Sequence, residues 1–126
     1  MKKVLLFLTG LQLFAGAAFG LPKYISAEKL VATAGTRVAL ASAKTLTTHA
    51  IIKARSTNAG LVYIGGVTVA AANGYHLAAN AEVKLSDLLA AGTNESFNLA
   101  ELYLDAANNG DGVRIIYVNS ADRFKP

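Results

Sequence analysis

Two histidines are the only side chains of this sequence with an ordinary pKa near neutral pH, because the chain contains no cysteine. His49 lies in the stretch THAIIKAR, and His76 follows an Asn-Gly-Tyr turn signal. A hydrolase built on Ser, His and Asp needs an activated serine, and the chain has no Gly-x-Ser-x-Gly sequence. The sequence therefore predicts that the protein is not an enzyme and that both histidines serve packing or the surface.

The stretch from Asp105 to Gly112 is rich in Asp, Asn and Gly, as many calcium-binding loops are. An EF-hand loop that began at Asp105 would need Asn or Asp at its third position and Glu at its twelfth, where Ala107 and Ile116 stand. The absence of cysteine excludes a Cys-based metal site, and no Walker or dinucleotide-binding glycine motif is present. We expect no metal and no cofactor.

A chain of 126 residues is long enough for one domain with one modest core. Lys and Arg outnumber Asp and Glu by 12 to 8, and eight of these cations precede Gly60, together with the single acid Glu28. Such an asymmetry favours head-to-tail contact or binding to a particle surface. No basic run is interleaved with aromatic residues, so nucleic acid is not an expected partner.

The first twenty residues, MKKVLLFLTGLQLFAGAAFG, have two lysines, an apolar run and small residues, which is the layout of a secretory signal peptide. Thr9, Gln12 and three glycines make the segment a poor membrane span, and Pro22 ends any helix there. Residues 1–21 are therefore either a cleaved signal or a retained hydrophobic arm buried against a partner. The predicted partner-binding side chains of the arm are Leu5, Leu6, Phe7, Leu8, Leu11 and Phe14.

From Ser26 onward, apolar residues alternate with polar ones in short runs that are separated by turn signals. The pattern predicts an all-β fold, an antiparallel β-sandwich of jelly-roll type, as a single domain over residues 22–126 behind the hydrophobic N-terminal arm. Asn109-Gly110 predicts a tight hairpin between the last two strands. The side chains predicted to face the core are Val38, Leu40, Ile52, Val83, Leu85, Leu102, Leu104 and Ile115.

Tyr103 is the best candidate for a subunit interface outside the arm. It falls in the stretch LAELYLDA, which predicts a strand with Glu101, Tyr103 and Asp105 on its polar face. Tyrosine in a strand is usually half-buried packing, but tyrosine is also enriched at protein interfaces. We therefore include Tyr103 among the predicted partner-binding residues.

Three stretches in this order, IIKARSTNAGLVYIGG, GYHLAANAEVKLS and NLAELYLDAANNGDGVRIIYVN, resemble the small β-sandwich proteins that decorate the heads of tailed bacteriophages. The shared features are an Asn-x-Gly turn before an aromatic-Ile-Gly strand, an acid-Val-x-Leu strand, a Leu-x-x-(Leu/Ile)-Tyr strand, a Gly-rich hairpin and a final apolar strand. They cover residues 47–119. The loop at residues 78–81 departs from the pattern, because it lacks a Pro-Gly pair.

The resemblance implies a virion structural protein, a decoration or cement subunit on the capsid exterior. Its expected partners are the major capsid protein and further copies of itself in a homotrimer, with no nucleic acid and no membrane. The alternative is an exported bacterial β-sandwich binding module, secreted or periplasmic, whose signal is cleaved after Gly20. The N-terminus of the mature chain separates the two hypotheses.

Overall fold

The computed structural model describes residues 23–88 and 96–119, and this part of the chain is built from strands and two short 3-10 helices. No helix in it is long and apolar enough to cross a membrane. In chain order, the elements are β1 (Tyr24–Leu30), β2 (Val38–Ala39), β3 (Leu46–Thr47), β4 (Ala50–Ala54), β5 (Val62–Gly65), β6 (Tyr75–Leu77), β7 (Glu82–Lys84), η1 (Leu85–Leu88), β8 (Phe97–Asn98), η2 (Leu99–Glu101), β9 (Tyr103–Ala106) and β10 (Gly112–Val118).

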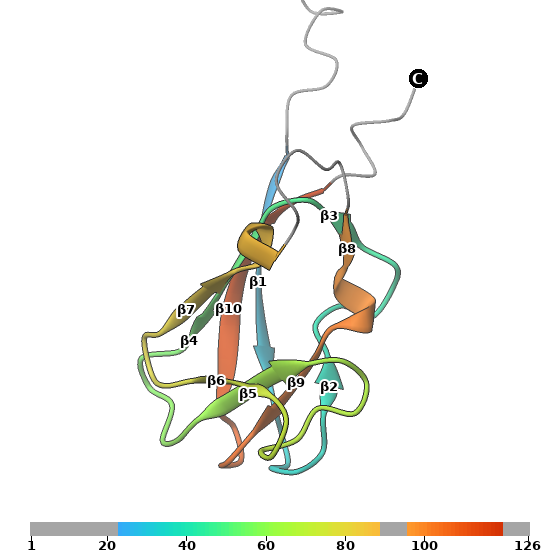
Figure 1. Cartoon of the computed structure of the whole chain (residues 1–126). Helices are drawn as coiled ribbons and strands as arrows, with labels where there is room; N and C mark the ends of the chain where they lie inside the picture. Colours follow the sequence, from blue (N-terminus) through green and yellow to red (C-terminus); the bar gives the residue numbers. More distant parts are fainter. Residues whose placement is uncertain (1–22, 89–95, 120–126) are drawn as a thin grey trace, which may run out of the picture.

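Two four-stranded antiparallel sheets pack against each other as a sandwich (Figure 1). Sheet A has the order β1-β10-β4-β7, and sheet B has the order β2-β9-β5-β6, while β3 and β8 form a small third sheet. Within the described ranges, β5 and β6 are the only consecutive strands that pair with each other. The all-β, antiparallel and sandwich-like parts of the prediction are confirmed, and pairing between segments distant in sequence holds the sheets together.

The core lies between the two sheets, and strand β4 shows how the sequence fills it. Ala50, Ile52 and Ala54 point inward and are buried, whereas Ile51 is half-buried and Lys53 is exposed on the other face. The predicted inward faces are confirmed. Among those residues, Leu40, Ile52, Leu85, Leu104 and Ile115 are buried, and Val38, Val83 and Leu102 are half-buried against the core.

The start of the ninth strand differs from the prediction. The sequence predicts a strand that begins at Leu99, but Leu99–Glu101 forms η2 and the strand begins only at Tyr103. The side chain of Asn98 caps η2, because its Oδ1 accepts a hydrogen bond from the Ala100 N–H at 3.1 Å. The Leu99 side chain turns into the core and is 1% exposed, so its burial favours this turn over a longer strand.

The predicted hairpin at Asn109-Gly110 is wrong. Strand β9 belongs to sheet B and β10 belongs to sheet A, so the turn carries the chain from one sheet to the other. Gly110 has a φ of +82°, and its N–H donates to the Val31 carbonyl at 2.8 Å. The dipeptide therefore does form a turn that needs glycine, but its partner is Val31, the residue after β1, rather than a neighbouring hairpin strand.

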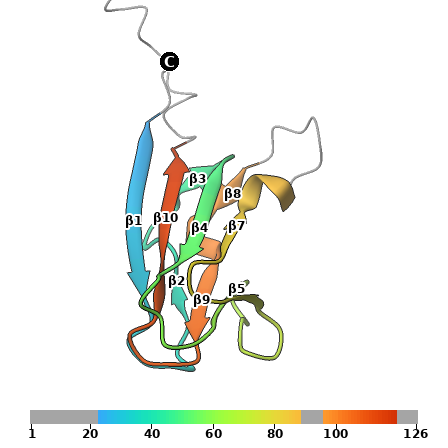
Figure 2. The same cartoon turned by 90° about the vertical axis from the view of Figure 1, so that its left-hand side faces the viewer.

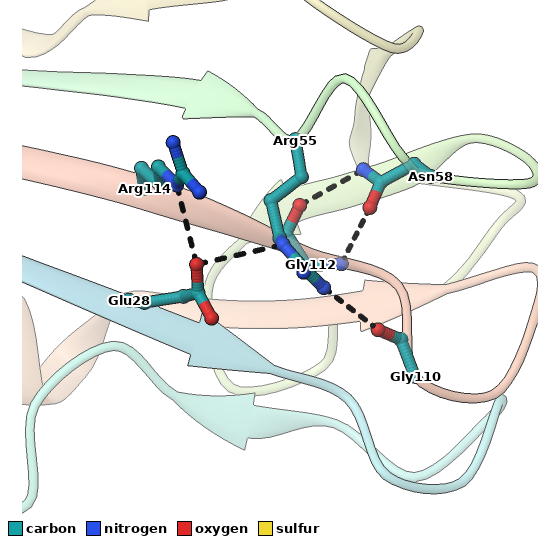
Figure 3. A network of polar contacts seen from close by, with 6 residues as sticks. All are labelled: Glu28, Arg55, Asn58, Gly110, Gly112 and Arg114. Atoms are coloured by element: carbon teal, nitrogen blue, oxygen red, sulfur yellow. Dashed lines mark hydrogen bonds and ion pairs between the residues drawn. The ribbon is translucent and has the colours of Figure 1, made fainter.

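A polar cluster ties the loop after β4 to the start of β10 (Figure 3). The Asn58 amide donates to the Gly112 carbonyl at 2.8 Å and accepts from the Gly112 N–H at 3.0 Å. Asp111 is 5% exposed, and its carboxylate accepts from the N–H groups of Ala59 and Gly60 at 2.9 and 2.8 Å. These side chains bind backbone groups of residues 59, 60 and 112, so they fix the loop against the start of β10.

Candidate partner-binding surface

The sequence-predicted binding residues fall into two groups. Those of the arm, Leu5, Leu6, Phe7, Leu8, Leu11 and Phe14, lie outside the described residues. Tyr103 lies in β9, on the face of sheet B that points away from the core, opposite Ala39 and Gly65 on the neighbouring strands. It is half-buried, and its role in partner binding stays a prediction.

The polar face predicted around Tyr103 does not form. Glu101 belongs to η2 rather than to the strand, and Asp105 is buried. The Asp105 carboxylate accepts from the N–H of Gly35 at 2.9 Å and from that of Ala106 at 2.8 Å. The turn before β2 thus covers this carboxylate, which binds backbone instead of facing solvent.

Within the described part of the chain, each histidine has one polar side-chain contact. The His49 Nδ1 lies 2.9 Å from the Thr48 hydroxyl, and the His76 Nε2 lies 2.8 Å from the Ala71 carbonyl. The His76 ring also packs edge-on against Tyr63, with a centroid distance of 4.9 Å. Among the described residues, no three His, Cys, Asp or Glu side chains gather where they could hold a metal ion.

Sheet A presents its outer face as a broad surface, and Figure 2 shows its four strands side by side. One residue from each strand forms a continuous row across this face. In the pairing register, Glu28 lies opposite Arg114, Arg114 opposite Lys53, and Lys53 opposite Glu82. All four are exposed, and we call them the charged row. Its charges follow the order negative, positive, positive, negative.

Arg55 contacts Glu28 at one end of the charged row (Figure 3). The Glu28 carboxylate lies 3.2 Å from Arg114 Nε and 3.5 Å from Arg55 Nε. The shorter contact is a hydrogen bond, while Arg55 Nε makes an ion pair without hydrogen-bond geometry. Arg55 also donates to the Gly110 carbonyl at 3.3 Å, so it joins the row to the turn before β10. One carboxylate shared by two guanidinium groups leaves a local excess of positive charge.

The next row across sheet A has two isoleucines at its centre and polar residues at its two ends. Ser26 lies opposite Ile116, Ile116 opposite Ile51, and Ile51 opposite Lys84. We call Ile51 and Ile116 the isoleucine pair; Ile51 is half-buried, and Ile116 is 44% exposed. An open groove of about 550 Å³ runs over both rows and is lined by the isoleucine pair and by the whole charged row.

A second hollow extends this surface toward the start of β1. It has a volume of about 290 Å³ and shares the isoleucine pair with the first groove. Tyr24 lines its far side and is 71% exposed, so an aromatic ring borders the apolar part of the surface. Large apolar groups held open to solvent beside paired charges are typical of protein-binding surfaces.

Sequence reasoning found parts of this surface but not the whole. The alternation in THAIIKAR and AEVKLS places Ile51, Lys53 and Glu82 on outward faces. The sequence pattern assigns no face to Glu28 or Arg114, and nothing local indicates that β1 and β4 flank β10. The row exists only because strands far apart in sequence pair in one register.

The side chains of this surface suit non-covalent binding. Guanidinium, ammonium and carboxylate groups stand beside branched apolar side chains, which together suit ion pairing and apolar contact with another macromolecule. Comparisons of the chain with protein-family models, with curated proteins and with solved structures find no match.

Proposed function

We propose that this protein is a virion structural protein, a decoration or cement subunit that binds the outer shell of a tailed-phage capsid and performs no catalysis. The observation that carries the proposal is the ordered set of motifs between residues 47 and 119, which resembles head-decoration proteins. The same stretch supplies β4–β7, β9 and β10, the greater part of both sheets. A rigid sandwich with one wide charged and apolar face is suited to holding neighbouring shell subunits together.

We also propose that the sandwich has jelly-roll connectivity. The strand order supports this assignment, because the chain passes from β1 in sheet A to β2 in sheet B, returns for β4, and crosses again to β5. After the β5–β6 pair, it crosses back to β7, then to β9, and ends in β10 beside β1. Two interleaved four-stranded sheets of this kind are the architecture of many capsid domains.

The proposed partners are the major capsid protein and two further copies of this chain in a homotrimer. A symmetric cluster of subunits would bind a shell through several equivalent weak contacts, and the linked contacts would strengthen one another through high effective concentration. The hydrophobic segment at residues 4–19 is proposed as a second attachment, retained in the mature protein and buried against other chains.

An exported bacterial β-sandwich binding module is the second candidate, and the composition of the first twenty residues favours it. In that case the mature chain would begin at Leu21 and act outside the cytoplasm or in the periplasm.

The test is mass spectrometry of particles purified from the phage whose genome encodes the chain. We expect the protein in stoichiometric amounts relative to the major capsid protein, with an intact mass that includes the first twenty residues. A protein absent from the particles would contradict the virion assignment. Recovery of a chain that begins at Leu21 from a bacterial culture fluid or periplasm would establish the second candidate instead.

A further inference from the structure

The charged row has an order of charges that repels a copy of itself. A two-fold axis parallel to the strands would place β1 of one copy over β7 of the other, and β10 over β4. Glu28 would then face Glu82, and Arg114 would face Lys53. A two-fold axis along the row would place each residue over its own equivalent. In both aligned arrangements, like charges oppose each other, which disfavours face-to-face association of two copies.

The same order of charges indicates which kind of partner would bind this face. The two central cations, Arg114 and Lys53, lie on adjacent strands, so their backbones are about 4.8 Å apart. Lys53 is exposed, and Arg114 has a side chain that is 75% exposed and uses its Nε for Glu28. Both cationic heads can therefore accept a further anionic group. The isoleucine pair lies in the next row, on the same two strands, and offers apolar contact directly beside the cations.

We infer that the outer face of sheet A is a docking surface for a different protein, which presents two acidic side chains to Arg114 and Lys53 and an apolar side chain to the isoleucine pair. Two acids one turn apart on a helix, about 5–6 Å between their Cβ atoms, match the spacing of the central cations. Glu28 and Glu82 at the two ends of the row would repel acidic side chains of the partner that lie outside the central positions. This repulsion would fix the register in which the partner binds.

A polyanion fits this face less well than an acidic protein surface. A nucleic-acid backbone that crosses the strands along the row would bring its phosphates over Glu28 or Glu82. A nucleic-acid backbone that follows the strands would pass from Arg114 and Lys53 directly onto Ile51 and Ile116 in the next row. These two side chains form no favourable contact with phosphate. An anionic membrane surface would meet the same two carboxylates. The isoleucine pair beside only two central cations therefore favours a folded protein partner.

This inference deepens the proposed function, because it says which surface of the protein would face the capsid shell. It rests on the proposed function only for the identity of the partner, the major capsid protein. The probe for the surface itself is an alanine-based helical peptide with two glutamates one turn apart and leucines on the same face. The matched probe carries lysines in place of the glutamates. The full chain should bind the acidic peptide about tenfold more tightly than the basic one at low salt, and the preference should shrink as salt screens the charges.

The decisive variant is K53E/R114E, which reverses the two central charges. We expect it to prefer the basic peptide, a reversal that a merely unfolded protein would not show. R37E is the control, because Arg37 is exposed in the loop before β2 and lies off this face; it should keep the preference for the acidic peptide. Equal binding of both peptides by the unaltered chain, or no reversal in K53E/R114E, would overturn the inference.

Further outcomes separate the competing partners. Stronger binding of duplex DNA or of phosphatidylserine vesicles than of the acidic peptide, lost in K53E/R114E, would replace the protein partner by a nucleic acid or a membrane. A changed oligomeric state of K53E/R114E would show that the face binds copies of this chain.

If the full chain shows the peptide preference but does not rebind phage particles stripped of it, the proposed function fails and the surface assignment stands. If it rebinds particles and K53E/R114E rebinds equally well, the function stands and the surface assignment fails.

Discussion

Asp111 illustrates how a single buried carboxylate organises a loop that has no strand partner. Each of its two oxygens accepts a hydrogen bond from a different backbone N–H, those of Ala59 and Gly60. Such charge-assisted bonds to backbone are strong, and an unsatisfied buried N–H is expensive. The Asp111 carboxylate and the Asn58 amide together fix the position from which Arg55 reaches the charged row.

Replacing Asp111 with Asn should destabilise the protein by about 1–3 kcal/mol, because the amide retains one acceptor and turns a donor toward the second N–H. Urea unfolding followed by circular dichroism measures this change. Asp87 is exposed in η1, and Asp87→Asn, the matched control, should stay within about 0.5 kcal/mol of the unaltered protein. Equal effects of the two substitutions would contradict the structural role of Asp111.

Strand β4 is the element that joins the core to the proposed docking surface, because its two faces serve different purposes. Ile52 is 0% exposed between the sheets, while Ile51, its neighbour in the chain, faces outward. The same residue type at consecutive positions therefore gives a direct comparison of the two faces.

Ile52→Ala should lower the free energy of unfolding by about 2–5 kcal/mol, since it opens a cavity in the core. Ile51→Ala should lower the free energy of unfolding by about 1 kcal/mol, because it removes less buried apolar surface than Ile52→Ala does. It should also weaken binding of the acidic peptide. Thermal or urea unfolding of both variants measures the difference. A larger loss of stability for Ile51→Ala than for Ile52→Ala would show that the faces of β4 are assigned the wrong way round.

The packing of β10 against β1 depends on one glycine. A Cβ at Gly112 would overlap the Lys29 carbonyl oxygen and would lie 2.9 Å from Leu30 Cα, so both obstacles are backbone atoms that cannot rotate away. Gly66, which follows β5, has open space around the same position and no positive φ. The two glycines are therefore under different constraints although both lie at strand ends.

Gly112→Ala should destabilise the protein by about 1–3 kcal/mol or more, because β1 must shift away from β10. Gly66→Ala should be neutral or stabilising by up to about 1 kcal/mol, since it restricts the unfolded chain without a clash. Chemical unfolding of the two variants side by side makes the comparison. A Gly112→Ala protein of unaltered stability would mean that the β1–β10 spacing is not as the structure has it.

At the scale of the whole molecule, the arrangement of charge bears on assembly. The outer face of sheet A disfavours aligned face-to-face pairing of two copies, so we expect copies to associate through other surfaces. Tyr103 on the outer face of sheet B and the hydrophobic segment at residues 4–19 are the remaining predicted contacts.

We therefore expect a homotrimer whose sheet A faces stay free for the partner. Sedimentation velocity of the full chain should give a mass of about three times 13.1 kDa, and K53E/R114E should give the same value, because the charged row lies outside the contact. Deletion of residues 2–20 or Tyr103→Ala should lower the association constant. A protein that is monomeric both alone and on its particle would refute the trimer.

The sequence alone determined many local features of the fold, although not the 3-10 helix at Leu99–Glu101. Alternation of apolar and polar residues identified β4, β7 and much of the core, because the side-chain period of a strand is a property of the backbone itself. A β-branched and aromatic run identified β5. Asn58, Gly60 and Gly110 marked turns for a similar reason, since these residue types tolerate or favour turn conformations.

Only the tertiary structure decided which strands meet. The Asn109-Gly110 turn has the composition of a hairpin but joins two sheets, because the strand after it pairs with β1 and β4. Asp105 has the spacing of an outward residue but is buried, since the turn before β2 folds over it. The charged row likewise combines residues from β1, β4, β7 and β10, and its order of charges depends on register across four strands. Pairing of this kind is set by packing of the whole core, which no local window of sequence contains.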